Sequence, residues 1–562
     1  MTSESVSGLA ALYRLTHSEE IPADLSVREK RLLDGALNFH ALMAPGRRLQ
    51  LYFYDGTWES LPRLTDDSSF NGLSRAFRAR LFDAEMESLV APEERVTLPA
   101  EEESIHLAGQ AARHLHVSRD DVIAYDPPRH IPTDPLRRVA RAIRARTPLM
   151  YDEVRDVELL RHRRSYTARA VRRNYAAEFA PGGVHDDTRI VPASPAPDGA
   201  VKAVLFGLHW FELGGAERWA FESVRIAREA GFLPIVLSNR DSHQPWISRQ
   251  ELDGALIIPF SEATVLSQTA GIEELLRAIL RTFDVRGVVV HHNQWLYDRL
   301  DWIALSRPDI PIVDSTHIVE YRGGGFPLSS VLVDDAITIH HTISPKLAQW
   351  MTETQGVAAE KVVMAPLGGL TVEPGDATFR HRVPGAPFTV AFVGRMARQK
   401  APEVFVQAVH RLMNSTVPMR FIMHGDGEMA TWVTDVIRGA GLEGVIERRT
   451  SAIPVAATLD EADLLVVSSH NEGLTLTTLE AIAHGLPVIS TDVGAQSDII
   501  PTRGLVSRNV HLAVRQIEKK VTWLAEDETA RELLWQEEHA AEQQLTRHAS
   551  ASEWFAREVS AW

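Results

Sequence analysis

The sequence predicts an α/β protein with two doubly wound, parallel-sheet domains that face each other across a cleft, after an N-terminal mixed α/β extension. Short apolar runs alternate with helical stretches over residues 200–372, and the alternation recurs over residues 385–545. This pattern is typical of consecutive βαβ units. Stretches rich in proline and glycine near residues 180–200 and 373–387 separate the regions. A C-terminal helix is expected over residues 546–562.

Composition narrows the class of protein. The chain has 562 residues, a formal net charge of -16 and no cysteine. The acidic balance argues against nucleic acid as a partner, and the lack of cysteine excludes disulfides, thiolate catalysis and cysteine-bound metals. The start of the chain has neither the basic nor the apolar part of a signal peptide, and no apolar run reaches 18 residues. We expect a cytoplasmic protein.

The strands of the two domains are predicted from short, β-rich apolar runs, and a helix is predicted over 216–230, where apolar residues recur on one face. In the first domain the strands are expected at 201–208, 234–237, 255–258, 287–290, 310–314 and 336–343. In the second they are expected at 388–393, 419–424, 444–447, 464–468 and 488–491. Ligands of such sheets bind at the carboxyl ends of the strands, here in the cleft.

The N-terminal region, residues 1–195, has a weaker pattern. Residues 50–58 and 121–128 each resemble a strand that runs into a turn, and the rest is mostly helical in pattern. We therefore predict a mixed α/β accessory region.

Two glycine-containing segments follow predicted strands. Gly214 and Gly215 open a helix, where paired glycines let the backbone approach a ligand and the free N–H groups attract an anion. The same pair can equally be a simple turn. Gly394 ends a strand and is followed by Arg395 and Lys400, two cations suited to a diphosphate. A solvated basic loop is the alternative interpretation.

Two further segments carry candidate polar groups. Residues 468–488 run from a strand through a loop into a helix, so that backbone N–H groups can form an anion-binding nest near Glu472. Glu480 lies three residues after Thr477, the spacing of a capping box, which leaves a purely structural role open. His317 follows another strand, where it faces the cleft or serves as a buried structural histidine.

Taken together, these segments resemble the retaining glycosyltransferases of family 4, which have the GT-B fold of two Rossmann-like domains. Gly214-Gly215-Ala-Glu217 resembles the glycine loop of the family, Thr316-His317 its cleft histidine, and Gly394-Arg395 with Lys400 its diphosphate-binding pair. Residues 472–480 resemble its E-x7-E motif. The resemblance covers about residues 200–545. Leu367, Thr475 and Ala401 depart from it, because the family usually has asparagine, glycine and glycine there.

The resemblance implies roles for these residues. Arg395 and Lys400 would stabilise the departing nucleoside diphosphate. Glu480 would bind the ribose, and Glu472 with the backbone of Gly473, Leu474, Thr475 and Leu476 would hold the donor sugar. His317 would contact the reacting sugar and assist proton transfer. Gly214 and Gly215 would approach the phosphate or the acceptor from the opposite wall, and with Gly394 these residues form the predicted site.

The resemblance also implies a hexosyltransferase-type enzyme that retains anomeric configuration and needs neither a metal nor another cofactor. The donor is expected to be a UDP-sugar, with a GDP-sugar second. The acceptor is expected to be a cell-envelope glycan, a lipid-linked sugar or a polymer. Two alternatives are open: a non-catalytic binding or scaffold protein with this fold, and a sugar-nucleotide epimerase with this fold.

The segment from Arg137 to Arg173 stands out from the acidic chain. It holds twelve arginines against four acids, a net charge of +8. One interpretation is a solvated helix whose arginines pair with acids elsewhere. The other is peripheral contact with an anionic surface, such as the inner face of a membrane or an anionic acceptor.

Overall fold

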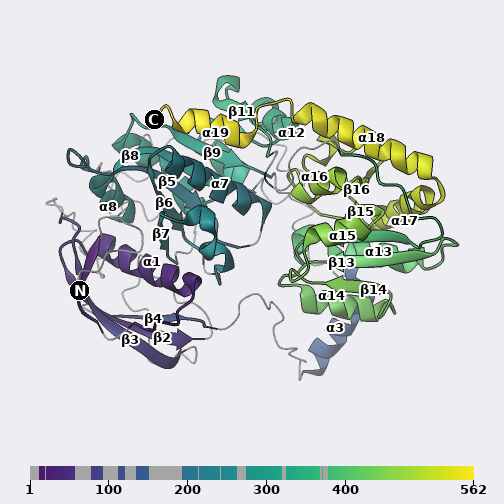
Figure 1. The fold of residues 1–562 in the computed structure, drawn as a ribbon, viewed down its shortest axis with the longest axis horizontal. Helices are drawn as coiled ribbons and strands as arrows, with labels where there is room; N and C mark the ends of the chain where they lie inside the picture. The colour runs from purple at the N-terminus through teal and green to yellow at the C-terminus, as the bar shows by residue number, and fades with distance from the viewer. Residues whose placement is uncertain are drawn as a thin grey trace.

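The computed structural model describes most of the two predicted domains and parts of the N-terminal region (Figure 1). The described residues are 12–18, 21–56, 77–92, 112–119, 134–150, 193–212, 214–240, 242–261, 274–318, 325–367, 370 and 377–562. The strand predicted at 121–128 and the arginines from Arg155 to Arg173 lie outside the described residues.

The N-terminal region forms a four-stranded sheet with one long helix against it. The strands are β1 (Tyr13–Ser18), β2 (Arg48–Gly56), β3 (Phe77–Ser88) and β4 (Ala112–Val117), in the order β1-β3-β2-β4. The helix α1 (Val27–Met43) begins at a capping box of Ser26 and Glu29 and packs near β7 of the next domain, where Gly35 contacts Pro259. β1, β3 and β4 lie where a mostly helical pattern was predicted, so that part of the prediction was wrong. The mixed α/β class was confirmed.

A seven-stranded parallel sheet forms the first doubly wound domain. Its order is β11-β10-β9-β8-β5-β6-β7, so the chain starts at β5 in the middle and winds outward to either side. The strands are β5 (Lys202–Leu208), β6 (Leu233–Ser238), β7 (Leu256–Pro259), β8 (Asp284–His291), β9 (Ile312–Thr316), β10 (Ile339–Thr342) and β11 (Val362–Met364). The α-helices are α7 (Gly215–Glu229), α8 (Glu274–Thr282), α9 (Gln294–Tyr297), α10 (Leu300–Ser306), α11 (Gly325–Leu332) and α12 (Pro345–Gln349).

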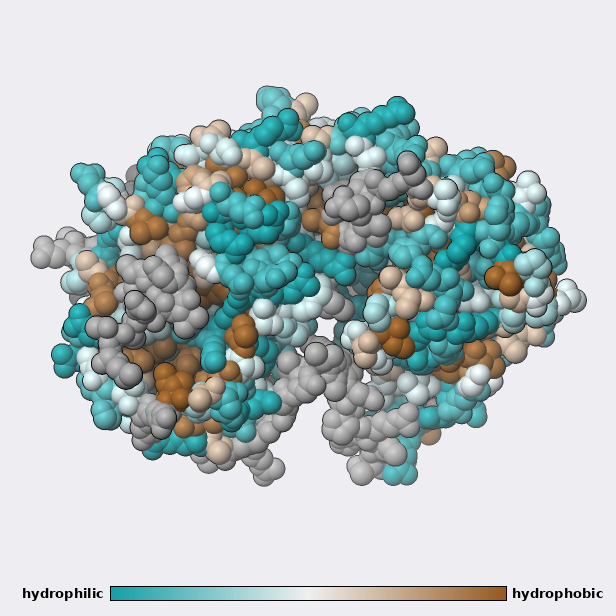
Figure 2. Space-filling view, in the orientation of Figure 1, coloured by the Kyte–Doolittle hydropathy of each residue, from teal (hydrophilic) through white to brown (hydrophobic). Residues whose placement is uncertain are grey.

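A six-stranded parallel sheet forms the second domain, in the order β14-β13-β12-β15-β16-β17. The strands are β12 (Phe388–Val393), β13 (Met419–His424), β14 (Ile446–Arg449), β15 (Leu464–Val467), β16 (Val488–Thr491) and β17 (Leu505–Val506). The α-helices are α13 (Pro402–Leu412), α14 (Ala430–Gly439), α15 (Val455–Glu461), α16 (Leu476–Ala483), α17 (Val510–Glu526) and α18 (Glu528–Leu545). The predicted architecture of two Rossmann-like domains is confirmed, and the surface is hollowed between them (Figure 2).

The end of the chain returns to the first domain. After α18, the last helix α19 (Ala551–Val559) packs on α7, with Phe555 edge-on to Trp219 at 6.2 Å between ring centroids (Figure 1). The N–H of Ala551 donates to the carbonyl of Pro366, which follows β11, at 2.9 Å. The C-terminal helix therefore belongs spatially to the first domain.

The described part of the arginine-rich segment is α3 (Pro135–Arg146), which packs on α14 of the second domain (Figure 1). Arg141 forms an ion pair with Asp435 at 2.6 Å, and the guanidinium of Arg144 lies 4.5 Å from the ring centroid of Trp432. Two of the predicted surface arginines therefore fasten α3 to the protein rather than face outward.

Candidate functional site

The predicted site residues lie at the carboxyl ends of central strands in both sheets. His317 follows β9 in the first domain, Arg395 follows β12, and the loop of Glu472 follows β15 in the second. β12 and β15 are neighbours at the point where the strand order of the second sheet reverses. Such a switch point is where doubly wound sheets bind ligands.

An ionic cluster forms the wall of the second domain. The ammonium of Lys400 lies 2.6 Å from Glu472 Oε1, which also accepts a hydrogen bond from Ser469 Oγ at 2.6 Å. Glu472 is buried while Lys400 is partly exposed, so the carboxylate holds the cation at the cleft. A Cβ on Gly394 would lie 3.6 Å from the Lys400 side chain, which places the strand end beside this pair.

Ala401 turns the chain between Lys400 and α13 in a left-handed conformation, with φ 45° and ψ 55°. A side chain there costs roughly 1–2 kcal/mol relative to glycine. This is the position at which the resemblance expected glycine. Ala401 therefore adopts a conformation that favours glycine, although it is an alanine.

Two cations and an acid connect the walls of the cleft. Arg218 at the start of α7 pairs with Glu480 of α16 at 3.2 Å, and Arg395 lies 5.7 Å from the ring centroid of Trp210. The capping box considered for Glu480 does not form, because the helix begins with Thr475 as its N-cap and Thr477 lies inside it. Glu480 therefore faces the cleft rather than the backbone of its own helix.

Two of the predicted glycines lie at close contacts between the domains. A Cβ on Gly473 would lie 1.8 Å from the carbonyl oxygen of His317, and one on Gly215 would lie 3.1 Å from Leu476. A Cβ on Gly214 would lie 2.0 Å from the carboxylate of Glu217 in its own segment, whereas Gly394 has only ordinary contact distances. Gly473 and Gly215 therefore let the two domains approach each other closely, with Leu474 buried at this junction.

Buried histidines form the opposite wall. His317 is 5% exposed, and burial lowers its pKa well below the usual value, with His292, His291 and His341 lowering it further. Its backbone N–H donates to His292 Nε2 at 3.1 Å. His292 itself has φ 54°, a left-handed conformation that non-glycine residues rarely adopt, and this places its ring 4.6 Å from that of His317. The first domain thus presents an uncharged imidazole to the cleft.

A cavity of about 80 Å³ lies between the two walls. His317, Glu472 and Gly473 line it together with Lys346, Trp350 and Arg508. Small-molecule sites usually measure about 300–1,000 Å³. The cavity between His317 and Glu472 is therefore smaller than a typical small-molecule site.

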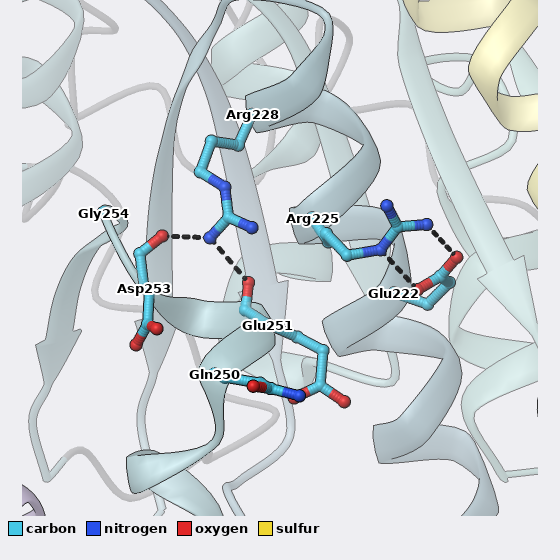
Figure 3. A pocket seen from close by; sticks show the side chains of 7 residues that line it. All are labelled: Glu222, Arg225, Arg228, Gln250, Glu251, Asp253 and Gly254. Atoms are coloured by element: carbon cyan, nitrogen blue, oxygen red, sulfur yellow. Dashed lines mark hydrogen bonds and ion pairs between the residues drawn. The ribbon is translucent and has the colours of Figure 1, made fainter.

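A second depression lies between α7 and residues 250–254 (Figure 3). Arg225 pairs with Glu222 at 2.6 Å, and Arg228 donates to the backbone carbonyls of Glu251 and Asp253. Because these charges satisfy one another, the depression offers little to a charged ligand.

Several residues of the site were not assigned a role from sequence. Arg218 and Trp210 contact predicted residues that are far away in the chain, whereas Ser469 and Ser315 contact predicted residues two or three positions away. Adjacency to a predicted motif was the signal for Arg218, which follows Gly-Gly-Ala-Glu, and for the two serines. Among the residues that the structure describes, no group of three His, Asp or Glu side chains could hold a metal ion.

Comparison with known proteins gives a family for the second domain. Residues 387–527 match the family model "Glycosyl transferases group 1". The D-inositol 3-phosphate glycosyltransferase of Kineococcus radiotolerans is 27% identical over 258 residues, which are 40% of this chain and 58% of that protein. The same enzyme from Streptosporangium roseum is 28% identical over 237 residues, 37% of this chain and 54% of that protein. The chain thus spans little more than half the length of these curated relatives.

Solved structures were compared as well. Anabaena HepE, in complex with UDP and glucose, covers 64% of this chain and 98% of its own, with 14% identity and a TM-score of 0.48. The family model and the curated relatives thus place a group 1 glycosyltransferase domain at residues 387–527, in agreement with the motifs of the second domain.

Proposed function

We propose that the chain is a retaining glycosyltransferase that moves a sugar from a nucleoside-diphosphate donor to a hydroxyl acceptor. The observation that carries the proposal is the Lys400–Glu472 pair, 2.6 Å apart at the switch point of the second sheet and opposite His317. A cation held by a buried acid beside a glycine-rich turn suits a diphosphate next to a polyhydroxylated sugar.

In this proposal the second domain stabilises the charge that develops on the leaving group. Lys400 and Arg395 neutralise the diphosphate as the bond to the sugar breaks. When the donor binds, Glu480 leaves its ion pair with Arg218 and accepts hydrogen bonds from the ribose hydroxyls. Glu472 and the backbone N–H groups of residues 473–476 hold the sugar. Retention follows if the acceptor attacks from the face that the phosphate leaves, with the phosphate oxygen as base, and no metal or other cofactor is needed.

Domain closure belongs to the same cycle. The cavity between His317 and Glu472, about 80 Å³, is smaller than a typical small-molecule site, and in this proposal the donor binds with the domains further apart. Closure then brings Gly473 against His317 and excludes water, the competing acceptor.

The donor is proposed to be a UDP-sugar, with GDP-sugars second. The acceptor is proposed to be a glycan, a lipid-linked sugar or an anionic polymer of the cell envelope. The curated relatives act, by their names, on D-inositol 3-phosphate. Phosphorylated polyols are therefore among the acceptors to be tested. A binding or scaffold protein and a sugar-nucleotide epimerase are the alternatives.

Nucleoside diphosphate release from a panel of sugar nucleotides tests the proposal. Wild type is compared with Lys400→Ala and Glu472→Ala, and Arg411→Ala serves as control, because Arg411 pairs with Glu518 on the protein surface. We expect release from one donor that only the two site variants abolish. Binding without release would favour the scaffold, and isomerised donor without transfer would favour the epimerase.

We also propose that α3 attaches the protein to an anionic lipid surface on the cytoplasmic side. Opposite its contact with α14, the helix carries Leu136, Val139 and Ile143, which are 79%, 57% and 54% exposed. Exposed arginines at 137, 138 and 146 flank this apolar stripe. An apolar stripe with basic flanks is typical of helices that lie in a membrane interface. None of the described helices is long and apolar enough to cross a membrane.

Flotation of the full chain with vesicles tests this attachment. We expect binding to vesicles with phosphatidylserine, weaker binding to neutral vesicles, and loss of binding when Leu136, Val139 and Ile143 are all changed to Ser. Leu512→Ser, at an apolar residue 49% exposed on α17, is the matched control. Equal binding by the triple variant, or a preference for neutral vesicles, would contradict the attachment.

A further inference from the structure

The hydroxyl of Ser315 joins three aromatic side chains beneath the cleft. Ser315 lies on β9, two residues before His317, and is 1% exposed. Its Oγ is 2.9 Å from Trp219 Nε1, 3.0 Å from His317 Nε2 and 2.8 Å from His341 Nδ1. The indole can only donate, and each imidazole nitrogen donates or accepts according to its tautomer. The positions of the protons therefore decide what His317 can do.

The carbonyl of Ala365 fixes the first proton. His341 Nε2 lies 2.8 Å from this oxygen, and a carbonyl can only accept, so Nε2 of His341 carries a hydrogen. Burial lowers the pKa of His341 to about 4, so the ring is neutral and its Nδ1 is an acceptor. The Ser315 hydroxyl therefore donates to His341 Nδ1.

The remaining contacts of Ser315 then follow. A hydroxyl has one hydrogen, and that hydrogen is used toward His341. Trp219 donates to one lone pair of Oγ, so His317 Nε2 must donate to the other. His317 is therefore held as the Nε2–H tautomer, with a lone pair on Nδ1.

The lone pair of His317 Nδ1 is left for a ligand. Nδ1 is buried and has no hydrogen-bond partner among the residues that the structure describes. A buried acceptor without a partner is costly, roughly 1–3 kcal/mol, and is uncommon in folded proteins. His317 is one of the residues that line the cavity, together with Glu472 and Gly473.

We propose that Ser315, supported by Trp219 and His341, is a positioning residue that holds His317 in the Nε2–H tautomer, so that Nδ1 accepts a hydrogen bond from a hydroxyl of the reacting sugar. The inference rests on the proposed function only for the identity of that hydroxyl. It assigns His317 an orienting role, as an acceptor that fixes the sugar during transfer, in place of the proton transfer expected from sequence.

Nitrogen NMR of the imidazole rings in the full chain tests the tautomer directly. In wild type we expect the His317 signals of the Nε2–H tautomer, assigned by their loss in His317→Gln. In Ser315→Ala we expect a mixture of tautomers, because Nε2–H loses its acceptor. Ser330→Ala is the matched control: it removes another buried serine, which bonds His340 Nδ1 at 2.9 Å in the same domain. A Nδ1–H tautomer in wild type, or an unchanged spectrum in Ser315→Ala, would overturn the proposal.

Kinetics separate positioning from stability. We expect Ser315→Ala to lower kcat at least tenfold with little change in donor KM, and Ser315→Thr, which keeps the hydroxyl, to recover most of the activity. His341→Gln, which can accept and donate in place of the imidazole, should be closer to wild type than His341→Leu. Equal losses in Ser315→Ala and Ser330→Ala would mean a structural role only. If wild type turns over no donor, the proposed function fails, whereas the NMR result still decides the tautomer.

Discussion

The two walls of the cleft handle charge in opposite ways. The first domain presents histidines whose pKa values burial holds down, to about 3 for His292 and about 4 for His341. The second domain presents Arg395, Lys400 and Glu472, and Lys400 is ion-paired with Glu472. A ligand whose phosphates meet the ionic wall and whose hydroxyls meet the neutral wall satisfies both. The division predicts that substitutions on the two walls fail in different ways.

The largest effect on activity is expected on the ionic wall. Lys400→Ala should lower kcat/KM for the donor at least 100-fold, about 2.7 kcal/mol of transition-state stabilisation, because the leaving diphosphate loses a cation. Lys400→Arg should keep part of the activity, and the control Arg411→Ala should keep all of it. The measurement is initial-rate kinetics. If Lys400→Arg lost as much activity as Lys400→Ala, the shape of the side chain and not its charge would matter at this position.

Asp314, an acid buried beneath the neutral wall, gives a test by pH. Burial raises its pKa from 3.8 to about 6. The charge of His340 and hydrogen bonds from Ser330 and from the Tyr297 hydroxyl, which lies 2.5 Å from Asp314 Oδ1, lower the pKa and so oppose part of the shift. Since the folded state binds the proton more tightly than the unfolded state, Asp314 makes stability fall as pH rises from about 4 to about 6. Relative to Asp314→Asn, wild type should lose up to about 3 kcal/mol over that range. Urea unfolding at several pH values measures this, and parallel curves would contradict it.

A smaller effect is expected at the turn after Lys400. Ala401→Gly should raise the free energy of unfolding by about 1 kcal/mol, because glycine adopts φ 45° without strain. As a control, Ala408→Gly within α13 should lower stability by a similar amount. Donor kinetics of Ala401→Gly should be unchanged, since the backbone path to Lys400 is kept. Destabilisation by Ala401→Gly would show that the turn does not have this conformation.

The smallest effect is expected at the ion pair across the cleft. Arg218 is about a third exposed, so its bond to Glu480 contributes little, about 0.5 kcal/mol. If Glu480 binds ribose, Arg218→Ala removes a competitor and should tighten nucleoside diphosphate binding about two- to threefold by calorimetry. Glu480→Gln should weaken binding. A weaker Kd in Arg218→Ala would mean that Arg218 itself contacts the nucleotide.

The sequence predicted the strands best where a mainly apolar run ends at a clear loop. β12, β13 and β16 were predicted at their observed bounds, because each is a short apolar run ended by a polar or glycine-rich loop. β11 and β17 were missed, since edge strands of three and two residues carry too little pattern. β3 was missed because polar residues alternate along it on a sheet exposed on one face, and its charges resemble those of a helix.

For the site, the sequence identified the residues that lie in motifs but not the contacts between them. Lys400 and Glu472 were chosen separately, and the structure places them 2.6 Å apart, although their roles stay predictions. The Ser315–His341 contact joins residues 26 positions apart through the pairing of β9 with β10, which sequence spacing does not encode. Packing of this kind appears only when the register of the strands is known.

The return of the C-terminal helix connects the two domains at one edge of the molecule. Within residues 200–562 the chain crosses between the domains twice, after β11 and again before α19, and the N–H of Ala551 bonds the carbonyl of Pro366 where these crossings meet. At the opposite edge α3 is ion-paired to the second domain through Arg141, while α1 and the N-terminal sheet pack on the first (Figure 1). The accessory region therefore joins the two domains at the edge opposite the C-terminal helix, so a change in the angle between the domains also moves α3 relative to the N-terminal sheet.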